Sequence, residues 1–250
     1  MLEAFQLALA TEGVLLIGLA AILAGIVRGF TGFGTAMVFL PVAAQFLGPF
    51  EVLTAFLLMD IVAPLMHVPR ALRDGHPRDV MRLGAGALFG VPVGVFLLTL
   101  VSAEVFRWGV SLSALVVLVL LVAGVRYRGV LTKWMIYLAG GLGGLLAGSV
   151  GQPGPPVIIL YMASSLPVKT VRANLTMYLI VADVLLFTAL GIGGFLVASA
   201  VSLGVLLIAP YLLGNWLGAV LFRPELERYY RWTAYAIIAG SAVLGMPFWD

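Results

Sequence analysis

Three ionisable side chains, Arg28, Asp60 and Asp183, stand inside long apolar stretches of this 250-residue chain. An arginine near the middle of a membrane costs at least about 2.5–3.5 kcal/mol on insertion scales, so it needs a partner or a wet cavity. A guanidinium can hold two oxygens of a sulfonate, sulfite or carboxylate at once. Arg28 therefore indicates an anion site. The alternatives are a structural ion pair with Asp60 or Asp183, or a side chain that reaches the membrane surface.

The two aspartates are the only acids deep within the predicted membrane spans. Ionisable groups in such places often belong to proton relays. Asp60 and Asp183 are therefore the candidates for carrying a coupling proton. The alternative for each is a pair with Arg28 or a cap on a broken helix.

Two glycine-rich breaks interrupt the apolar pattern, RGFTGFG at 28–34 and GSVGQPGPP at 148–156. Unwound backbone inside a membrane is tolerated only where protein or a water-filled cavity satisfies its polar groups. The helices after the breaks are predicted to begin near Thr35 and Pro155, and helix N-termini suit anions. In transporters built from inverted repeats, such half-helix ends lie near the midplane, at the substrate site. The alternative is that these glycines only allow close helix packing.

The candidate substrate-binding residues lie at these breaks, with one asparagine near the start of a later helix that we expect to face the second break. They are Arg28, Gly29, Thr31, Gly32, Gly34, Thr35, Ser149, Gly151, Gln152, Gly154, Pro155 and Asn174. Any one of these polar side chains could instead make an ordinary interhelical hydrogen bond.

The sequence predicts neither an enzyme nor a cofactor. It has no cysteine, no Ser-His-Asp set, no Walker loop and no dinucleotide fingerprint, and His67 and His76 lack the spacing of metal ligands. We therefore expect no catalytic residues, no metal and no cofactor.

The composition excludes an ordinary soluble domain. Hydrophobic residues make up 62% of the chain and charged residues only 10%, whereas a soluble domain has about 25% charged residues. The net charge of +3 comes from bases scattered through short loops, so membrane orientation explains it better than nucleic acid does. We predict an all-α polytopic protein, a single transmembrane domain over residues 1–250 surrounded by the lipid bilayer.

Eight apolar stretches are separated by short polar loops, and the first and fifth contain the two breaks. They cover 13–47, 52–69, 83–101, 108–125, 134–163, 171–198, 200–222 and 232–248. A shift of 119 residues places Gly29 on Gly148 and Gly32 on Gly151. This repetition predicts two repeats, over 13–125 and 134–248, with coincidence among glycines and leucines as the alternative.

The positions of the basic residues predict the topology. Twelve of the 14 Lys and Arg residues fall in four loop clusters: Arg70, Arg73, Arg78 and Arg82; Arg126, Arg128 and Lys133; Lys169 and Arg172; and Arg223, Arg228 and Arg231. If each broken segment returns to the side it entered from, all four clusters become cytoplasmic, as loop charges tend to be. Both termini then lie outside, and Arg107 is the exception. Each half makes three crossings, so the halves are inverted. Two short crossings per broken segment would give the same loop sides.

The residues at the breaks resemble the TauE/SafE family of sulfite and organosulfonate exporters, over nearly the full length. The resemblance rests on residues 29–41 (GFTGFGTAMVFLP) and 148–160 (GSVGQPGPPVIIL), and is reinforced by 70–80, 84–94 and 171–175. Thr35 and Ala36 stand where the family commonly has glycines, and Gln152-Pro153 interrupts the second motif. The motif positions carried over are Gly32, Gly34, Gly151, Gly154 and Pro155.

The resemblance implies proton-driven export of a small sulfur-containing or carboxylate anion across the inner membrane. We therefore expect a secondary transporter that binds its anion at the hairpin tips, with a homodimer among the assemblies it could form. The competing classes are a non-transporting assembly partner in the membrane and an anion channel.

Overall fold

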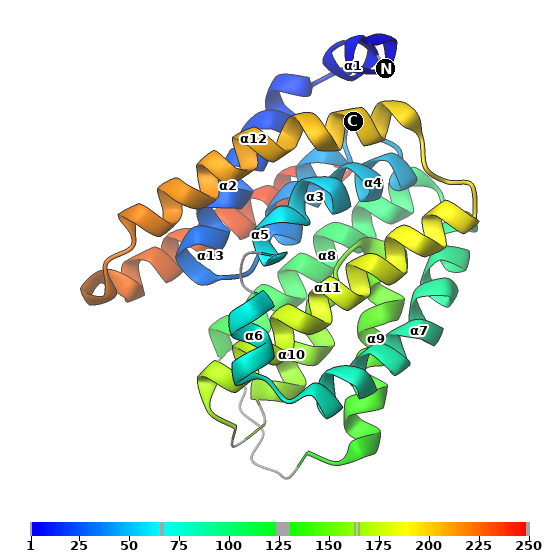
Figure 1. Cartoon of the computed structure of the whole chain (residues 1–250). Coiled ribbons are helices and arrows are strands. Elements are labelled where there is room, and N and C mark those ends of the chain that lie inside the picture. Colours follow the sequence, from blue (N-terminus) through cyan, green and yellow to red (C-terminus); the bar gives the residue numbers. More distant parts are fainter. Residues whose placement is uncertain (1, 66–67, 124–130, 163, 165, 249–250) are drawn as a thin grey trace. The chain divides into compact units, whose positions relative to one another are not determined.

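The computed structural model describes residues 2–65, 68–123, 131–162, 164 and 166–248, and every regular element in these residues is a helix (Figure 1). Five helices are long and apolar enough to cross a membrane, or six if Pro49–Leu65 and Val68–Asp74 count as one bent span. The prediction of an all-α polytopic membrane protein is confirmed. His67, Arg126 and Arg128 lie outside the described residues.

Most helices follow the predicted apolar stretches, but the stretch 52–69 is interrupted at Ile61. One further helix, α1 (Leu2–Leu9), precedes the first stretch, and two short ones, over Val68–Asp74 and Pro224–Leu226, lie mostly in predicted loops. Those of the first half are α2 (Val14–Thr31), α3 (Thr35–Ala43), α4 (Pro49–Asp60), α5 (Val62–Leu65), α6 (Val68–Asp74), α7 (Pro77–Thr99) and α8 (Ala103–Ala123). Those of the second half are α9 (Lys133–Val150), α10 (Gly154–Met162), α11 (Val168–Ile192), α12 (Ala198–Leu221), the short 3₁₀ helix η1 (Pro224–Leu226) and α13 (Glu227–Leu244).

The chain forms two compact units that do not coincide with its two halves. Unit 1 contains residues 1–60, 102–118 and 195–250, and unit 2 contains 61–101 and 119–194. Unit 1 therefore joins α2, α3 and α4 of the first half to α12 and α13 of the second. Unit 2 joins α9, α10 and α11 to α6 and α7. The repeats over 13–125 and 134–248 stay a prediction.

In unit 1, α2 and α12 pack in direct backbone contact through small residues. A Cβ on Gly25 would lie 2.7 Å from the Asn215 nitrogen, and a Cβ on Gly29 would lie 2.5 Å from the Asn215 carbonyl oxygen and 2.7 Å from the Ala219 nitrogen. The residue numbers of the contacts rise together along α2 and α12, so the two helices run parallel. Membrane helices associate through such close approach because lipid provides no hydrophobic drive between them.

In unit 2, α7 and α9 pack in the same way and lie side by side in Figure 1. Gly86 and Gly90 of α7 contact the α9 backbone, and Gly144 and Gly148 of α9 contact the α7 backbone, again in parallel order. In both units the first helix of one half therefore pairs with a helix of the other half. The repeat and the inversion of the halves stay predictions.

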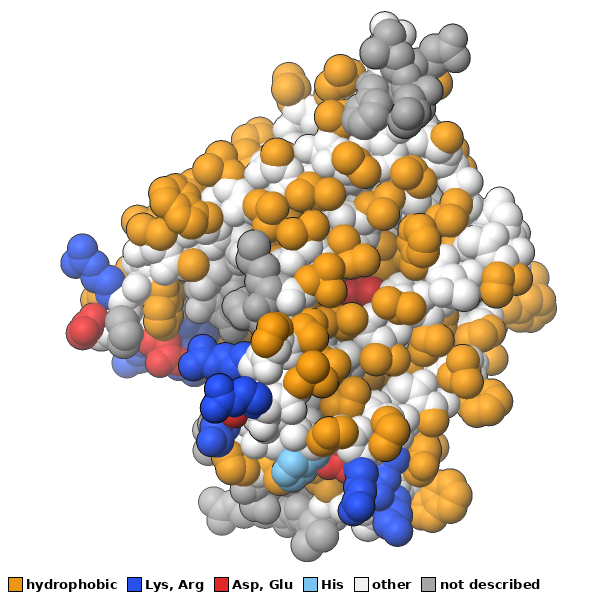
Figure 2. Space-filling view, in the orientation of Figure 1, with side chains coloured by type: hydrophobic (Ala, Val, Ile, Leu, Met, Phe, Trp, Pro, Cys, Tyr) orange, Lys and Arg blue, Asp and Glu red, His pale blue; other side chains and the backbone are white. Residues whose placement is uncertain are grey.

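The outer surface of the helices is strongly apolar. Leu15, Phe89 and Ile192 have exposed fractions of 81%, 75% and 85%, and hydrophobic side chains cover most of the face shown in Figure 2. A monomeric soluble protein rarely exposes apolar patches of more than a few hundred Å². These side chains are placed to face lipid.

The first broken segment forms a hairpin. α2 ends at Thr31 and has Gly32 (φ 79°) as its C-cap, Gly34 has φ 96°, and α3 begins at Thr35. Beyond α3, the ring of Phe46 occupies the space that a side chain on Gly13 would need. Because Gly13 directly precedes α2 and Phe46 follows α3, the first broken segment begins and ends at nearby points. It must do so if it returns to the side of the membrane from which it entered.

The second broken segment turns at the equivalent place. α9 ends at Val150 and has Gly151 (φ 69°) as its C-cap, which the 119-residue shift aligns with Gly32, and α10 begins at Gly154. The chain folds back here, since a Cβ on Gly143 would lie 2.6 Å from the Pro153 carbonyl oxygen. Positive φ angles favour glycine, because a Cβ there meets the following carbonyl oxygen. Both turn positions were predictable for this reason.

Candidate functional site

Four polar side chains meet at the tip of the first hairpin within unit 1. Arg28 Nη1 lies 2.9 Å from each carboxylate oxygen of Asp60 and 3.1 Å from Thr35 Oγ1. The Tyr211 hydroxyl donates a short hydrogen bond to Asp60 Oδ1, and it lies 3.4 Å from Thr35 Oγ1. We call Arg28, Thr35, Asp60 and Tyr211 the Arg28 cluster.

Helix ends position three of these four side chains. Arg28 belongs to the last turn of α2, and its carbonyl accepts the Gly32 N–H at 2.6 Å, which closes the helix. The tight turn then places Thr35, the first residue of α3, beside the guanidinium. Asp60 is the last residue of α4. Tyr211 comes from α12, directly after Pro210.

The Arg28 cluster is buried. The side chains of Arg28 and Asp60 are 11% and 8% exposed, and Tyr211 is fully buried. Taking two charges out of water is costly, and the pair is tolerated only if good geometry and further hydrogen bonds compensate. The contacts with Thr35 and Tyr211 supply such bonds.

The structure thus gives Arg28 a partner, and it is Asp60, one of the two acids predicted for that pairing. Asp183 belongs to α11 of unit 2 and is partly buried. The two candidate proton carriers therefore have different surroundings, and of the two only Asp60 belongs to the cluster.

The other predicted residues of the first hairpin have local structural roles. Gly29 lies against the α12 backbone, so its geometry favours packing. The Thr31 hydroxyl lies 2.8 Å from the carbonyl oxygens of Val27 and Phe33 and stabilises the turn. Gly32 has open space beside it, and Gly34 is the N-cap of α3. Thr35 is the predicted residue that the turn brings to Arg28.

In unit 2, Asn174 joins three elements. Its side chain is fully buried, its Oδ1 accepts the His76 backbone N–H at 2.7 Å, and its Nδ2 donates to the Tyr161 hydroxyl at 3.0 Å. Tyr161 is on α10, so Asn174 faces the second hairpin, as expected. The contacts tie the loop before α7 to α10 and α11, which is a positioning role.

The remaining predicted residues of the second hairpin lie close to its turn. Ser149 Oγ donates to the Leu145 carbonyl oxygen at 2.8 Å within α9. Gln152 is 2% exposed. Gly154 begins α10, and Pro155 and Pro156 follow it. Because proline has no N–H, the first turn of α10 offers fewer backbone donors than the first turn of α3.

Sequence reasoning missed two tyrosines, Tyr211 and Tyr161. Each lies in an apolar stretch, and each hydroxyl finds a polar partner in the structure. Buried tyrosine hydroxyls usually have such a partner. That rule marks a tyrosine in a membrane helix as a candidate, but its partner is given only by the fold.

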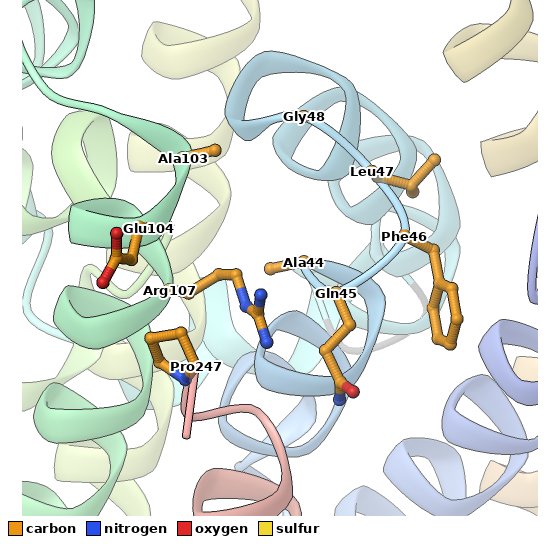
Figure 3. Close-up of a pocket in the computed structure, with 9 residues that line it drawn as sticks. All are labelled: Ala44, Gln45, Phe46, Leu47, Gly48, Ala103, Glu104, Arg107 and Pro247. Atoms are coloured by element: carbon orange, nitrogen blue, oxygen red, sulfur yellow. The ribbon is translucent and has the colours of Figure 1, made fainter. Parts of the chain in front are cut away.

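A separate pocket of about 530 Å³ lies between the loop after α3 and the start of α8, within unit 1. Figure 3 shows the Arg107 guanidinium directed toward this loop, while the Glu104 carboxylate points away from it. Arg107 Nε also donates to the Gly245 carbonyl oxygen at 3.4 Å. None of the predicted site residues lines this pocket.

Among the residues that the structure describes, no group of three or more His, Cys, Asp or Glu side chains could hold a metal ion. The Arg28 cluster contains one cation, one carboxylate and two hydroxyl groups. This set can bind an anion and hold a proton.

A family model described as sulfite exporter TauE/SafE matches residues 17–244. The match includes both hairpins and all four residues of the Arg28 cluster. No curated protein and no solved structure matches the chain.

Proposed function

Since this chain belongs to the TauE/SafE family of sulfite exporters, we propose that its Arg28 cluster is the anion site of a secondary transporter. Membership makes the chain a multi-pass membrane transporter of sulfite or related anions and not an enzyme. The finer proposal is that sulfite, an organosulfonate or a related carboxylate binds at the tip of the first hairpin and is exported.

One observation carries this proposal: a buried arginine stands beside the first turn of a half-helix inside an apolar segment. A guanidinium matches two oxygens of a sulfonate or carboxylate. The N–H groups at the start of α3 add donors and a partial positive charge. Thr35 contributes a hydroxyl 3.1 Å from Arg28 Nη1.

The second hairpin is proposed to present Ser149, Gly151, Gln152, Gly154 and Pro155 to the transport pathway. Its first turn is poorer in backbone donors, as described above, so we give it the smaller part in anion binding. Asn174 positions this hairpin through Tyr161.

Proton coupling is part of the proposal, with Asp60 as the carrier in unit 1 and Asp183 as a second candidate in unit 2. An acid within a membrane segment commonly takes part in proton relays. We also propose that the basic loops face the cytoplasm and that both termini lie outside the inner membrane.

Transport into proteoliposomes tests the proposed site. Sulfite, sulfoacetate and the zwitterionic sulfonate taurine are supplied in labelled form, and we expect saturable uptake that Arg28→Lys weakens and Arg28→Ala abolishes. The matched control is Arg231→Ala, because Arg231 forms an exposed pair with Glu227 at 2.8 Å.

Unchanged transport by Arg28→Ala would overturn the site. Flux that never saturates would point to a channel. The double variant Arg28→Met with Asp60→Leu serves as a folding control, because it removes both buried charges together.

A further inference from the structure

We infer that Asp60 and the transported anion take turns on Arg28, so that each anion binds together with one proton on Asp60. This inference rests on the proposed function, because it assumes that the anion binds at the Arg28 cluster. It adds a coupling rule: anion and proton cross the membrane in the same direction, so an exported anion carries a proton out with it and is not driven by protons that enter.

The contacts of Arg28 Nη1 show why the anion must replace Asp60. Arg28 Nη1 bears two hydrogens, and it lies 2.9 Å from each Asp60 oxygen and 3.1 Å from Thr35 Oγ1. Both hydrogens of Nη1 are therefore occupied in the structure. An anion that binds this nitrogen must displace the Asp60 carboxylate.

The negative charges of Asp60 and the anion explain why a proton binds with the anion. The Asp60 side chain is 8% exposed in its pair with Arg28, so a displaced carboxylate stays away from water and beside the incoming anion. Two negative charges in one buried site repel strongly, and a proton on Asp60 removes this repulsion. In the exchange, the Arg28–Asp60 ion pair breaks, the Arg28–anion pair forms, and one proton moves from solvent to an Asp60 oxygen. The net charge of the site changes by the charge of the anion plus one, which is zero for a monovalent anion.

Tyr211 is the positioning residue for this exchange. Its hydroxyl donates to Asp60 Oδ1, and it lies 3.4 Å from Thr35 Oγ1. A tyrosine hydroxyl can also accept. Once Asp60 is protonated, its O–H can donate to Tyr211, and Tyr211 can turn its own hydrogen toward Thr35. The hydrogen-bond chain then runs in the opposite direction, and Asp60 keeps a partner in both forms.

A proton-uptake measurement tests the rule on the purified full-length protein. The probe is methanesulfonate, whose sulfonate stays ionised at neutral pH, so any proton taken up is bound by the protein. Calorimetric titrations in two buffers of different ionisation enthalpy give the number of protons per anion. We expect about one, with an affinity that weakens about tenfold for each unit of rising pH.

Asp60→Asn removes the competitor, so we expect binding without proton uptake and with little dependence on pH. Glu227→Gln, in the exposed pair with Arg231, is the matched control and should keep the wild-type uptake. Tyr211→Phe should still bind methanesulfonate but shift the pH profile of its affinity, which a purely structural role would not do. Because the wild-type measurement needs no variant, the test stands even if Asp60→Asn fails to fold.

The outcomes separate the two proposals. If the wild type binds methanesulfonate without taking up a proton, the coupling rule is wrong and the anion site survives. If Arg28→Ala binds as well as the wild type, the anion site itself is wrong. Uptake that persists in folded Asp60→Asn would move the proton to another group and overturn this assignment.

Discussion

At the scale of single residues, a charge inside a membrane protein needs a partner or a wet cavity, and Arg28 has Asp60 as its partner. The pair is about one-tenth exposed on each side, whereas the pair of Arg231 and Glu227 is 52% and 60% exposed. Exposed pairs contribute about 0–1 kcal/mol. Breaking a buried pair costs about 3–5 kcal/mol, because one charge is left alone.

Asp60→Ala should therefore lower the free energy of unfolding by about 3–5 kcal/mol, and Glu227→Ala should lower it by less than about 1 kcal/mol. Denaturant unfolding in detergent micelles measures both values. The double change Arg28→Met with Asp60→Leu should recover most of the loss. Equal effects of Asp60→Ala and Glu227→Ala would show that the buried pair adds no stability.

At this scale the pair was one of the alternatives that the sequence left open for Arg28, with Asp60 or Asp183 as the partner, and its setting was not predicted. Arg28 and Asp60 stood out because charges inside apolar stretches are rare. Tyr211 did not, because it lies 151 residues from Asp60 along the chain. A contact over such a distance is set by the packing of α12 against α2 and α4, which no local pattern reveals.

At the scale of elements, the glycines of α2 differ in their packing against other helices. A Cβ on Gly29 would meet the α12 backbone at 2.5 Å, whereas a Cβ on Gly18 would have none of the described atoms within 4 Å. Backbone cannot move aside as a flexible side chain can. Overpacking of this kind costs about 1–3 kcal/mol.

We expect Gly29→Ala to destabilise the protein by about 1–3 kcal/mol and Gly18→Ala to be neutral or stabilising by up to about 1 kcal/mol. Thermal unfolding of the two variants side by side measures the difference. Equal melting temperatures would mean that α2 and α12 separate easily, which would contradict the close contact.

The turns of the two hairpins make a different prediction, because Gly32 and Gly151 have positive φ angles. Gly32 has open space around it, so a substitution there is opposed by backbone strain and not by a clash. Gly32→Ala should cost about 1–2 kcal/mol, and Gly32→Asn less, since asparagine tolerates this conformation. Unfolding free energies check the order. A larger loss with asparagine than with alanine would contradict it.

Element boundaries were largely predictable from the sequence, because glycine and proline mark the turns at 32–34 and 151–153. The partners of the helices were not. From the sequence, Gly29 is equally compatible with an anion site and with a helix contact. Its proximity to Asn215 in the structure assigns it to helix packing.

At the scale of the whole molecule, neither half of the chain contains a complete unit. Unit 1 needs residues 195–250 from the second half, and unit 2 needs residues 61–101 from the first. A chain divided between the two repeats should therefore give fragments that are unstable alone and stable when produced together. Copurification of the tagged first half with the second tests this. A stable, monodisperse first half on its own would contradict the division into units.

The parallel pairing of α2 with α12 also sets an order of events during synthesis. The residues that complete unit 2 are all made by position 194, whereas α12 begins only at Ala198. About 170 residues separate the end of α2 from the start of its partner, which is roughly 10–30 s at the usual speed of a ribosome. During that time the glycines of α2 that contact α12 have no packing partner. Unit 2, made from the middle of the chain, can fold first, and unit 1 is completed only when the last part of the chain packs against the first.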